Sequence, residues 1–182
     1  MRRARGFTLV EILVVVVIIA IVATGAVLSL SVLGQDRELD TERDRLVDLL
    51  NYAQDEAALQ TRELGLYCTL DGYRFLIFNP RTNLWENVKD DDALRARQLP
   101  DGLQIRLSVE SHDVVLKTSA QLEQATDTDP QTYKPHVMIF SNGDLTSFEL
   151  TLEREGTDRS ATIVPNDQGR IVVRDASAEK TG

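Results

Sequence analysis

The order of hydrophobic and polar positions divides the chain into three parts. Residues 12–33 form an uncharged and almost wholly apolar run of 22 residues. At about 1.5 Å per residue, a helix of this length measures about 33 Å and matches the hydrocarbon core of a bilayer, about 30 Å thick. Arginines precede the run and acidic residues follow it, so the positive-inside rule places residues 1–5 in the cytoplasm. The first part therefore predicts one membrane-spanning helix.

The second part is rich in charge, and its apolar residues recur at helical spacing. One helical face carries an apolar stripe made of Leu39, Leu46, Leu50, Ala53, Ala57 and Leu64. No proline occurs in residues 1–79, which predicts a continuous helix with Gly25 or Gly34 as weak points and Gly65 as its stop. A coiled coil is the alternative for the stripe, but the heptad pattern is short and the alanines favour packing on a sheet.

From residue 66 the apolar period changes to two, which is typical of strands. The sequence predicts a hairpin around Asp71-Gly72, a short strand near Trp85, a strand at 103–109, and hairpins that turn at Asn142-Gly143 and at 165–169. It predicts a helical turn at 92–97 and a polar loop at 118–135. The expected fold is α+β, with a long N-terminal helix packed on an antiparallel β-sheet domain.

Composition limits the partners of this chain. There are 20 Lys and Arg against 29 Asp and Glu, which gives a formal charge of −9, and three of the arginines lie in residues 1–6. The body is therefore acidic and repels nucleic acid and anionic lipid surfaces. Cys68 is the only cysteine, so it forms no internal disulfide, and its apolar surroundings predict a small buried hydrophobe.

Candidate catalytic and metal-binding residues are few. His112 and His136 lack metal-ligand spacing and are expected on the surface or at a strand edge. The acidic run at 90–92 could suggest calcium, but it leads into Ala-Leu-Arg and is better explained as a helix N-cap. Ser141 lies in a turn without the Gly-x-Ser-x-Gly of a nucleophile elbow. We therefore expect no metal, no cofactor and no enzymatic activity.

Glu11 is the unusual residue of the amino-terminal segment. A carboxylate at the membrane boundary needs a partner or must lose its charge. If the chain is cut after Gly6, the new amine at Phe7 of a neighbouring copy can neutralise Glu11, but only within an assembly. Two alternatives explain the apolar run but give Glu11 no role. One is a plain single-pass anchor, and the other is a cleaved secretory signal, whose hydrophobic region is normally shorter.

The stretch Gly6-Phe7-Thr8-Leu9-Val10-Glu11 and the apolar run after it resemble the class III signal of type IV pilins and type II secretion pseudopilins. The resemblance implies that prepilin peptidase cuts after Gly6. It also implies that Phe7 becomes the N-methylated first residue and that Glu11 serves filament assembly. The protein would then lie in the bacterial inner membrane, with its N-terminus cytoplasmic and its C-terminal domain periplasmic.

A narrower resemblance covers about residues 1–152 and points to the H-type minor pseudopilin of type II secretion. Family positions are matched by Gly65, Gly72, Tyr73, Phe75, Ser141, Gly143, Asp144, Thr146 and Phe148. Asn142 departs from the family, where proline is common. The resemblance implies a non-enzymatic pseudopilus subunit that takes part in exporting folded proteins across the outer membrane, near the tip but able to lie beneath another subunit because it has Glu11.

The partners implied are other major and minor pseudopilins, prepilin peptidase, the inner membrane, and secreted substrates or the secretin, with no nucleic acid. A minor pilin of a type IV pilus is the nearest alternative, and a membrane-anchored periplasmic enzyme is a more distant one. The expected segments are a leader at 1–6, a transmembrane helix half at 7–33, an amphipathic helix half at 34–64, a periplasmic β-rich domain at 65–175 and a tail at 176–182.

Overall fold

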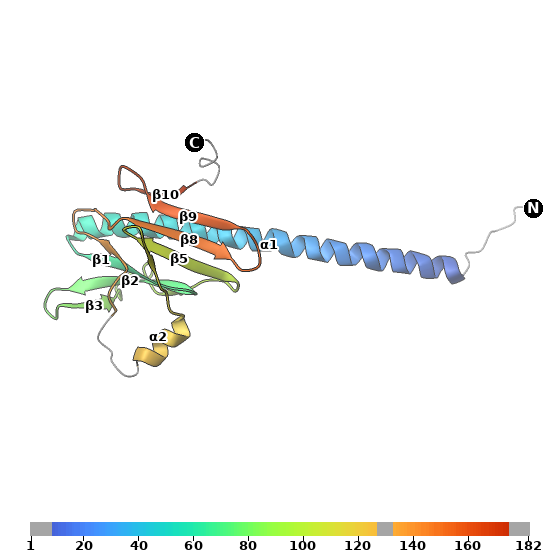
Figure 1. The fold of residues 1–182 in the computed structure, drawn as a ribbon, viewed down its shortest axis with the longest axis horizontal. Coiled ribbons are helices and arrows are strands. Elements are labelled where there is room, and N and C mark those ends of the chain that lie inside the picture. Colours follow the sequence, from blue (N-terminus) through green and yellow to red (C-terminus); the bar gives the residue numbers. More distant parts are fainter. Residues whose placement is uncertain (1–8, 127–132, 175–182) are drawn as a thin grey trace, which may run out of the picture. The chain divides into compact units, whose positions relative to one another are not determined.

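The computed structural model describes residues 9–126 and 133–174, and the side chains of 23–36 and 123–126 are not part of that description. The chain divides into two compact units, residues 1–38 and 39–182. Helix α1 (Leu9–Gln60) runs through both, and the second unit also holds the strands and helix α2 (Ser119–Thr126) (Figure 1). The predicted α+β fold with a long N-terminal helix on antiparallel strands is confirmed.

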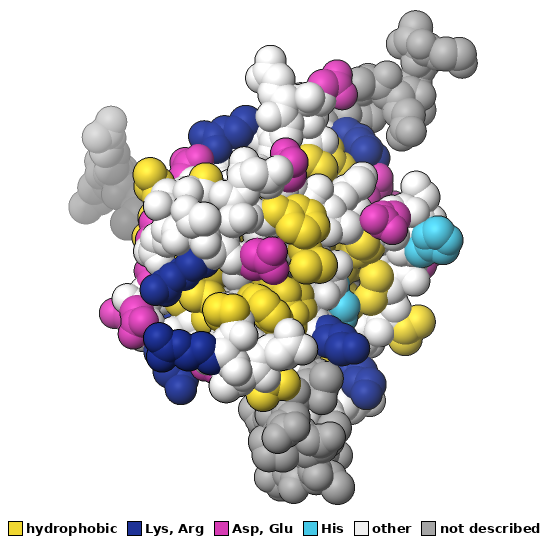
Figure 2. Space-filling model, turned by 90° about the vertical axis from the view of Figure 1, so that its left-hand side faces the viewer, with side chains coloured by type: hydrophobic (Ala, Val, Ile, Leu, Met, Phe, Trp, Pro, Cys, Tyr) yellow, Lys and Arg dark blue, Asp and Glu magenta, His cyan; other side chains and the backbone are white. Residues whose placement is uncertain are grey.

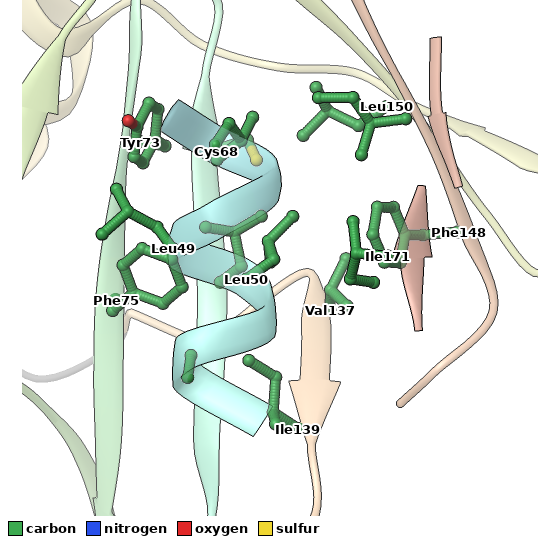
Figure 3. Close-up of a cluster of buried hydrophobic side chains, with 14 of the residues drawn as sticks. Leu49, Leu50, Cys68, Tyr73, Phe75, Val137, Ile139, Phe148, Leu150 and Ile171 are labelled. Carbon is green, nitrogen blue, oxygen red and sulfur yellow. The ribbon is translucent and has the colours of Figure 1, made fainter. Parts of the chain in front are cut away.

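In the second unit, α1 packs through the apolar stripe predicted from the sequence, except that Leu64, the last predicted member of the stripe, lies beyond the end of the helix. Leu46, Leu50, Ala53 and Ala57 have no exposed surface. Figure 3 shows Leu50 between the two walls of the core, with Phe75 on one side and Phe148 on the other. Full burial of a leucine contributes about 1.5–3 kcal/mol relative to exposure, so this stripe fixes the helix to the domain.

The first sheet is antiparallel and has the strand order β3-β2-β1-β7, with β4 also paired to β2. Its strands are β1 (Leu64–Thr69), β2 (Gly72–Asn79), β3 (Leu84–Asn87), β4 (Arg97–Gln98) and β7 (Val137–Ile139). The predicted hairpin at 71–72 is confirmed. Its register pairs Thr69 with Gly72, so the two loop residues are Leu70 and Asp71.

The second sheet is also antiparallel and has the order β10-β9-β8-β5-β6. Its strands are β5 (Leu103–Val109), β6 (His112–Val114), β8 (Phe148–Arg154), β9 (Ser160–Pro165) and β10 (Ile171–Arg174). Burial alternates along β8, as expected for a strand with one face on the core. The predicted strand at 103–109 and the hairpin that turns near 165–169 are confirmed.

The helix α1 ends at Gln60 rather than at residue 64, and Gly65 is not its stop. Thr61 takes a positive φ of 52°, and Arg62 N donates to Ala57 O at 3.1 Å. This bond closes the helix in the manner of a Schellman motif. Gly65 instead lies inside β1, so the chain changes from helix to strand several residues earlier than predicted.

The turn at Asn142-Gly143 is confirmed, with a positive φ of 86° at Gly143, but the hairpin predicted around it is wrong. β7 pairs with β1 in the first sheet, whereas β8 pairs with β5 and β9 in the second. In the described structure the two arms are joined close to the turn, by an isolated bridge between Ile139 and Leu145 and by Met138 N, which donates to Thr146 Oγ1 at 3.3 Å. The chain crosses here from one wall of the core to the other.

The segment 118–135 was predicted to be a loop, but its first half contains α2. Thr118 and Gln121 cap the helix reciprocally: Gln121 N donates to Thr118 Oγ1 at 3.2 Å, and Thr118 N donates to Gln121 Oε1 at 3.0 Å. This is a capping box, which satisfies two backbone donors at the start of a helix. Residues 127–132 of the predicted loop lie outside the described residues.

Candidate functional site

The amino-terminal segment holds the residues that the sequence singled out. Gly6 and Phe7 lie outside the described residues. Glu11 lies in the first turn of α1 with an exposed side chain. A carboxylate in that turn interacts favourably with the positive end of the helix dipole, so the structure places a negative group at the start of the apolar helix.

The surface of α1 that follows Glu11 is apolar on all sides. Within residues 9–22, the large hydrophobic side chains are between 44% and 82% exposed. An apolar surface of this kind marks a region that packs against protein or lipid. Among the described residues, no helix is long and apolar enough to cross a membrane. The predicted span also includes residues 23–33, whose side chains lie outside the description.

Two amide side chains of α1 hold the C-terminal part of the domain, and we call Asn51 and Gln54 the amide clasp. Asn51 Nδ2 donates to Ile171 O at 3.2 Å, and Ile171 N donates to Asn51 Oδ1 at 3.1 Å. Gln54 Nε2 donates to Gly143 O at 3.0 Å and to Gly169 O at 2.7 Å. The clasp therefore ties the helix to strand β10 and to two turns.

The outer face of the first sheet carries an aromatic cluster formed by Tyr67, Arg74, Tyr133 and His136. The rings of Tyr67 and His136 are stacked at 4.5 Å, and the Arg74 guanidinium lies 4.8 Å from the centre of the Tyr133 ring. His136 Nδ1 accepts a hydrogen bond from Cys68 N at 3.1 Å. Burial lowers the pKa of His136, which favours the neutral ring that this bond requires.

The structure places the other candidate residues as follows. Cys68 is buried, as predicted, and burial raises the pKa of its thiol, so the thiol stays protonated and unreactive. His112 is exposed on β6, and His136 lies at the edge of β1 beside the start of β7. The sequence predicted positions on the surface or at a strand edge for both histidines. In the described residues, no group of three His, Cys, Asp or Glu side chains is placed to hold a metal.

The acidic run at 90–92 leads into a turn and not into the predicted helical turn at 92–97. Asp91 Oδ1 accepts from Ala93 N at 2.8 Å, while Asp91 Oδ2 accepts from the Tyr52 hydroxyl at 2.7 Å. The second bond raises the pKa of Tyr52 to about 12. Asp91 thus joins the loop to α1, a contact between distant segments that local sequence pattern could not reveal.

Two family models match the chain. A prokaryotic N-terminal methylation motif matches residues 1–27. The model described as type II transport protein GspH matches residues 42–169. The first match covers the segment that contains Glu11, and the second covers most of the folded domain, including the amide clasp and the aromatic cluster.

The curated relatives are similar over nearly their whole length. Type II secretion system protein H of Pseudomonas aeruginosa is 35% identical over 172 residues, which span 94% of this chain and 95% of the relative. The protein of the same name from Aeromonas hydrophila is 31% identical, with 94% of each chain covered. These similarities include both the amino-terminal segment and the domain.

Two solved structures share the fold. Both are of the minor pseudopilin EpsH from the type II secretion system of Vibrio cholerae. One gives a TM-score of 0.61 at 19% identity and covers 76% of this chain and 97% of that chain. The other gives 0.59 at 16% identity, with 75% and 96% covered. At these identities the likeness concerns the fold.

Proposed function

This chain belongs to the GspH family of type II transport proteins, and from that premise we propose that its amino-terminal helix is processed, membrane-inserted and then built into a filament. It is a minor pseudopilin, a structural subunit of the type II secretion pseudopilus, which takes part in exporting folded proteins across the outer membrane. As a pseudopilin with an N-terminal methylation motif, it is anchored in the inner membrane.

The proposed processing and topology follow from the motif and the charge pattern. Prepilin peptidase cuts after Gly6, and Phe7 becomes the N-methylated first residue. Residues 7–33 cross the membrane once, with the N-terminus in the cytoplasm and the domain in the periplasm. The observation that supports this most directly is the methylation motif at residues 1–27, within which the described side chains of residues 9–22 form an exposed, largely apolar helix surface.

Glu11 is proposed to set the position of each subunit in the filament. A carboxylate in an apolar segment costs several kcal/mol unless an opposite charge compensates it. The amine of Phe7 on a neighbouring subunit supplies that charge once the helices pack side by side. Incorporation is then favoured over the isolated state, because the pair forms only in the assembly.

The proposed partners are the other major and minor pseudopilins along the helix, prepilin peptidase during maturation, and secreted substrates or the secretin at the tip. A subunit with Glu11 can accept the amine of another subunit, so this chain can lie beneath a neighbour. The acidic body, with a formal charge of −9 for the whole chain, is unsuited to nucleic acid.

Processing is tested by mass spectrometry of the chain purified from membranes. The expected mature chain begins at a methylated Phe7. Replacement of Gly6 with a bulky residue should block the cut, whereas Gly6→Ala should be partly tolerated. An intact Met1 on the protein that co-purifies with other pseudopilins would overturn the proposal.

The role of Glu11 is tested with Glu11→Gln and Glu11→Val in cells that contain the other subunits. Both variants should be cleaved normally but recovered with partner pseudopilins at least about tenfold less than the wild type, since a lost compensated charge pair is worth more than about 1.4 kcal/mol. Asp48→Asn, on the exposed face of α1 in the domain, is the matched control. Normal recovery and secretion with the Glu11 variants would contradict the proposed role.

A further inference from the structure

A buried carboxylate lies where α1 enters the second unit. That unit begins at Leu39, and Glu42, one helical turn further on, is only 5% exposed. Glu42 also lies one turn before Leu46, so it shares the face of α1 that packs on the strands. Figure 2 shows the more usual placement of charge, with acidic and basic side chains on the surface around the hydrophobic ones. Glu42 therefore needs compensation inside the domain.

Arg45 supplies only part of that compensation. Arg45 Nη1 forms an ion pair with Glu42 Oε1 on the same helix, but the side chain of Arg45 is 43% exposed while that of Glu42 is 7% exposed. A carboxylate can accept about four hydrogen bonds, and a buried one is stabilised only when further donors satisfy its remaining lone pairs. The strands that cover this face of the helix are the source of such donors.

Two donors of the first sheet lie on this face and have no acceptor among the described residues. They are the Tyr73 hydroxyl and Arg97 Nε, and both atoms are buried. Tyr73 and Arg97 are cross-strand partners in the β2–β4 ladder, so their side chains leave the same face of the sheet with Cβ atoms about 5 Å apart. Tyr73 belongs to the core cluster that contains Leu46, so this face is the one turned toward α1.

The pKa of Tyr73 shows that Glu42 lies near its hydroxyl. Burial raises this pKa to about 12, and the Glu42 carboxylate raises it more than any other charged group, whereas Arg97 and Arg45 oppose the rise. Figure 3 shows the hydroxyl on the side of the ring that points away from Cys68. A phenylalanine would fill the same space without burying a polar group, so the hydroxyl is accounted for only if it is bonded.

We infer that one buried water molecule accepts hydrogen bonds from Arg97 Nε and the Tyr73 hydroxyl and donates one to the Glu42 carboxylate. Buried waters typically make about three hydrogen bonds to polar groups that lack other partners, and these three groups supply that number. The water joins α1 to β2 and β4. It therefore fixes the helix to the first sheet at the place where the helix enters the domain.

The first test is Tyr73→Phe in the full chain in detergent, because a bonded and an unbonded hydroxyl predict opposite results. If the water holds the hydroxyl, its removal should lower the equilibrium constant for folding about fivefold, as for loss of one hydrogen bond. Denaturant unfolding followed by Trp85 fluorescence measures this constant. Tyr67→Phe, on the outer face of the same sheet, is the matched control and should leave it unchanged. A Tyr73 variant as stable as the wild type, or more stable, would overturn the inference.

A double-mutant cycle tests whether the groups act through one shared site. Arg97→Lys keeps the charge but removes Nε, and alone it should also lower the equilibrium constant for folding. Combined with Tyr73→Phe, it should lower the constant by less than the product of the two single effects, because both substitutions act on the same water. The pair Tyr67→Phe and Arg97→Lys is the control and should be multiplicative. Multiplicative effects for Tyr73 and Arg97 would contradict a shared site.

Two further measurements locate the site. In Tyr73→Phe, amide hydrogen exchange should speed up by a larger factor in residues 40–46 than in α2, because the loss is local to the start of the helix in the domain. Equal acceleration in both segments would contradict the anchoring role. Crystals of the full chain in detergent should show a water oxygen within about 3.2 Å of Tyr73 Oη and Arg97 Nε. A direct bond between Tyr73 and Glu42, with no water between them, would overturn the inference.

Discussion

Asn51 and Gln54 show how two uncharged side chains can organise a domain. Both project from the face of α1 that packs on the strands, and each bonds to backbone of the C-terminal half of the chain. Gln54 is only 4% exposed, and its Oε1 accepts no hydrogen bond from the described residues. Burial of an amide oxygen without a donor costs free energy. The two hydrogen bonds that Gln54 Nε2 donates to carbonyls on separate turns offset this cost.

We expect Asn51→Ala and Gln54→Ala each to lower the free energy of unfolding by about 1–2 kcal/mol, because each removes two hydrogen bonds to backbone groups of the C-terminal half of the chain. Denaturant titration of the detergent-solubilised chain, read from Trp85, measures the change. Asp48→Ala on the exposed face of the same helix should change it by less than about 0.5 kcal/mol. Equal effects of all three substitutions would show that the clasp does not stabilise the domain.

His136 makes the edge of the first sheet sensitive to pH. Its pKa is lowered by burial, and its neutral Nδ1 accepts the Cys68 amide beyond the last β7 partner in the ladder. The unfolded chain therefore binds a proton more readily than the folded one. The neutral ring of His136 therefore stabilises the folded state fully above the pKa of the histidine in the unfolded chain, about 6.5. This stabilisation is lost as pH falls from there through the lower pKa of His136 in the folded chain.

We expect the wild type to lose stability relative to His136→Ala as pH is lowered from 7.5 to 5.5. Comparison of unfolding midpoints at each pH isolates the histidine, because all other groups titrate equally in both proteins. His112→Ala, at an exposed position on β6, should follow the wild type. Parallel pH curves for the wild type and His136→Ala would contradict the prediction.

At the scale of elements, the glycines show where sequence pattern succeeds and where it fails. Gly143 takes a positive φ of 86°, so the turn prediction had the correct physical cause. Gly65 and Gly72 instead lie in strands, where an added Cβ would come within 2.4 Å of Pro135 Cβ and of Arg97 O, respectively. Close approach of a distant segment leaves no trace in the local pattern, so Gly65 was mistaken for a helix stop.

Elements that depend on local sequence pattern could be predicted from the sequence, whereas those that depend on contacts between distant segments could not. The apolar stripe through Leu46 and Leu50, the hairpin around Asp71-Gly72 and the strand at 103–109 depend on periodicity and were predicted. The split of β7 and β8 between two sheets depends on long-range pairing and was missed. Helix α2 had a local signal, the Thr118-x-x-Gln121 capping box, but the prolines and polar residues around it favoured a loop.

The position of α2 depends on Asp71 in the β1–β2 loop. Asp71 Oδ1 accepts from Ser119 N and Ser119 Oγ, both at 2.8 Å. Partial burial opposes ionisation, but the bonds from Ser119 prevail and lower the pKa of Asp71. The ionised Asp71 carboxylate therefore stabilises the folded state above the pKa of this residue in the unfolded chain, near 3.8. This stabilisation is lost as pH falls through the lower pKa of Asp71 in the folded chain.

We expect Asp71→Ala to speed amide hydrogen exchange in residues 119–126 and to lower the free energy of unfolding by about 1 kcal/mol, as for loss of a helix cap. Asp113→Ala, at an exposed position on β6, is the control and should leave exchange in α2 unchanged. Unaltered exchange in the Asp71 variant would show that α2 is held by its apolar contacts alone.

At the scale of the whole molecule, the two units expose opposite kinds of surface. The described side chains of α1 in the first unit are almost all apolar and exposed, whereas the second unit buries its apolar residues and carries most of the charge. This division suits a pseudopilin, whose helix must leave the bilayer for a filament while its domain stays in water. In the proposed function, the apolar helix surface is covered first by lipid and then by the helices of other subunits.

If the units fold independently, removal of residues 1–38 should leave the domain intact. In the described residues, both buried clusters consist of side chains from Leu39 onward, so the deletion removes no core contact. Residues 39–182 should be soluble without detergent and unfold with a free energy within about 0.5 kcal/mol of the full chain in detergent. Trp85 fluorescence reports both transitions, and a truncated chain that lacks a cooperative transition would show that the anchor helps to fold the domain. Glu11→Val in the full chain should likewise leave the transition unchanged while it impairs assembly, which separates the requirements for folding from those for filament formation.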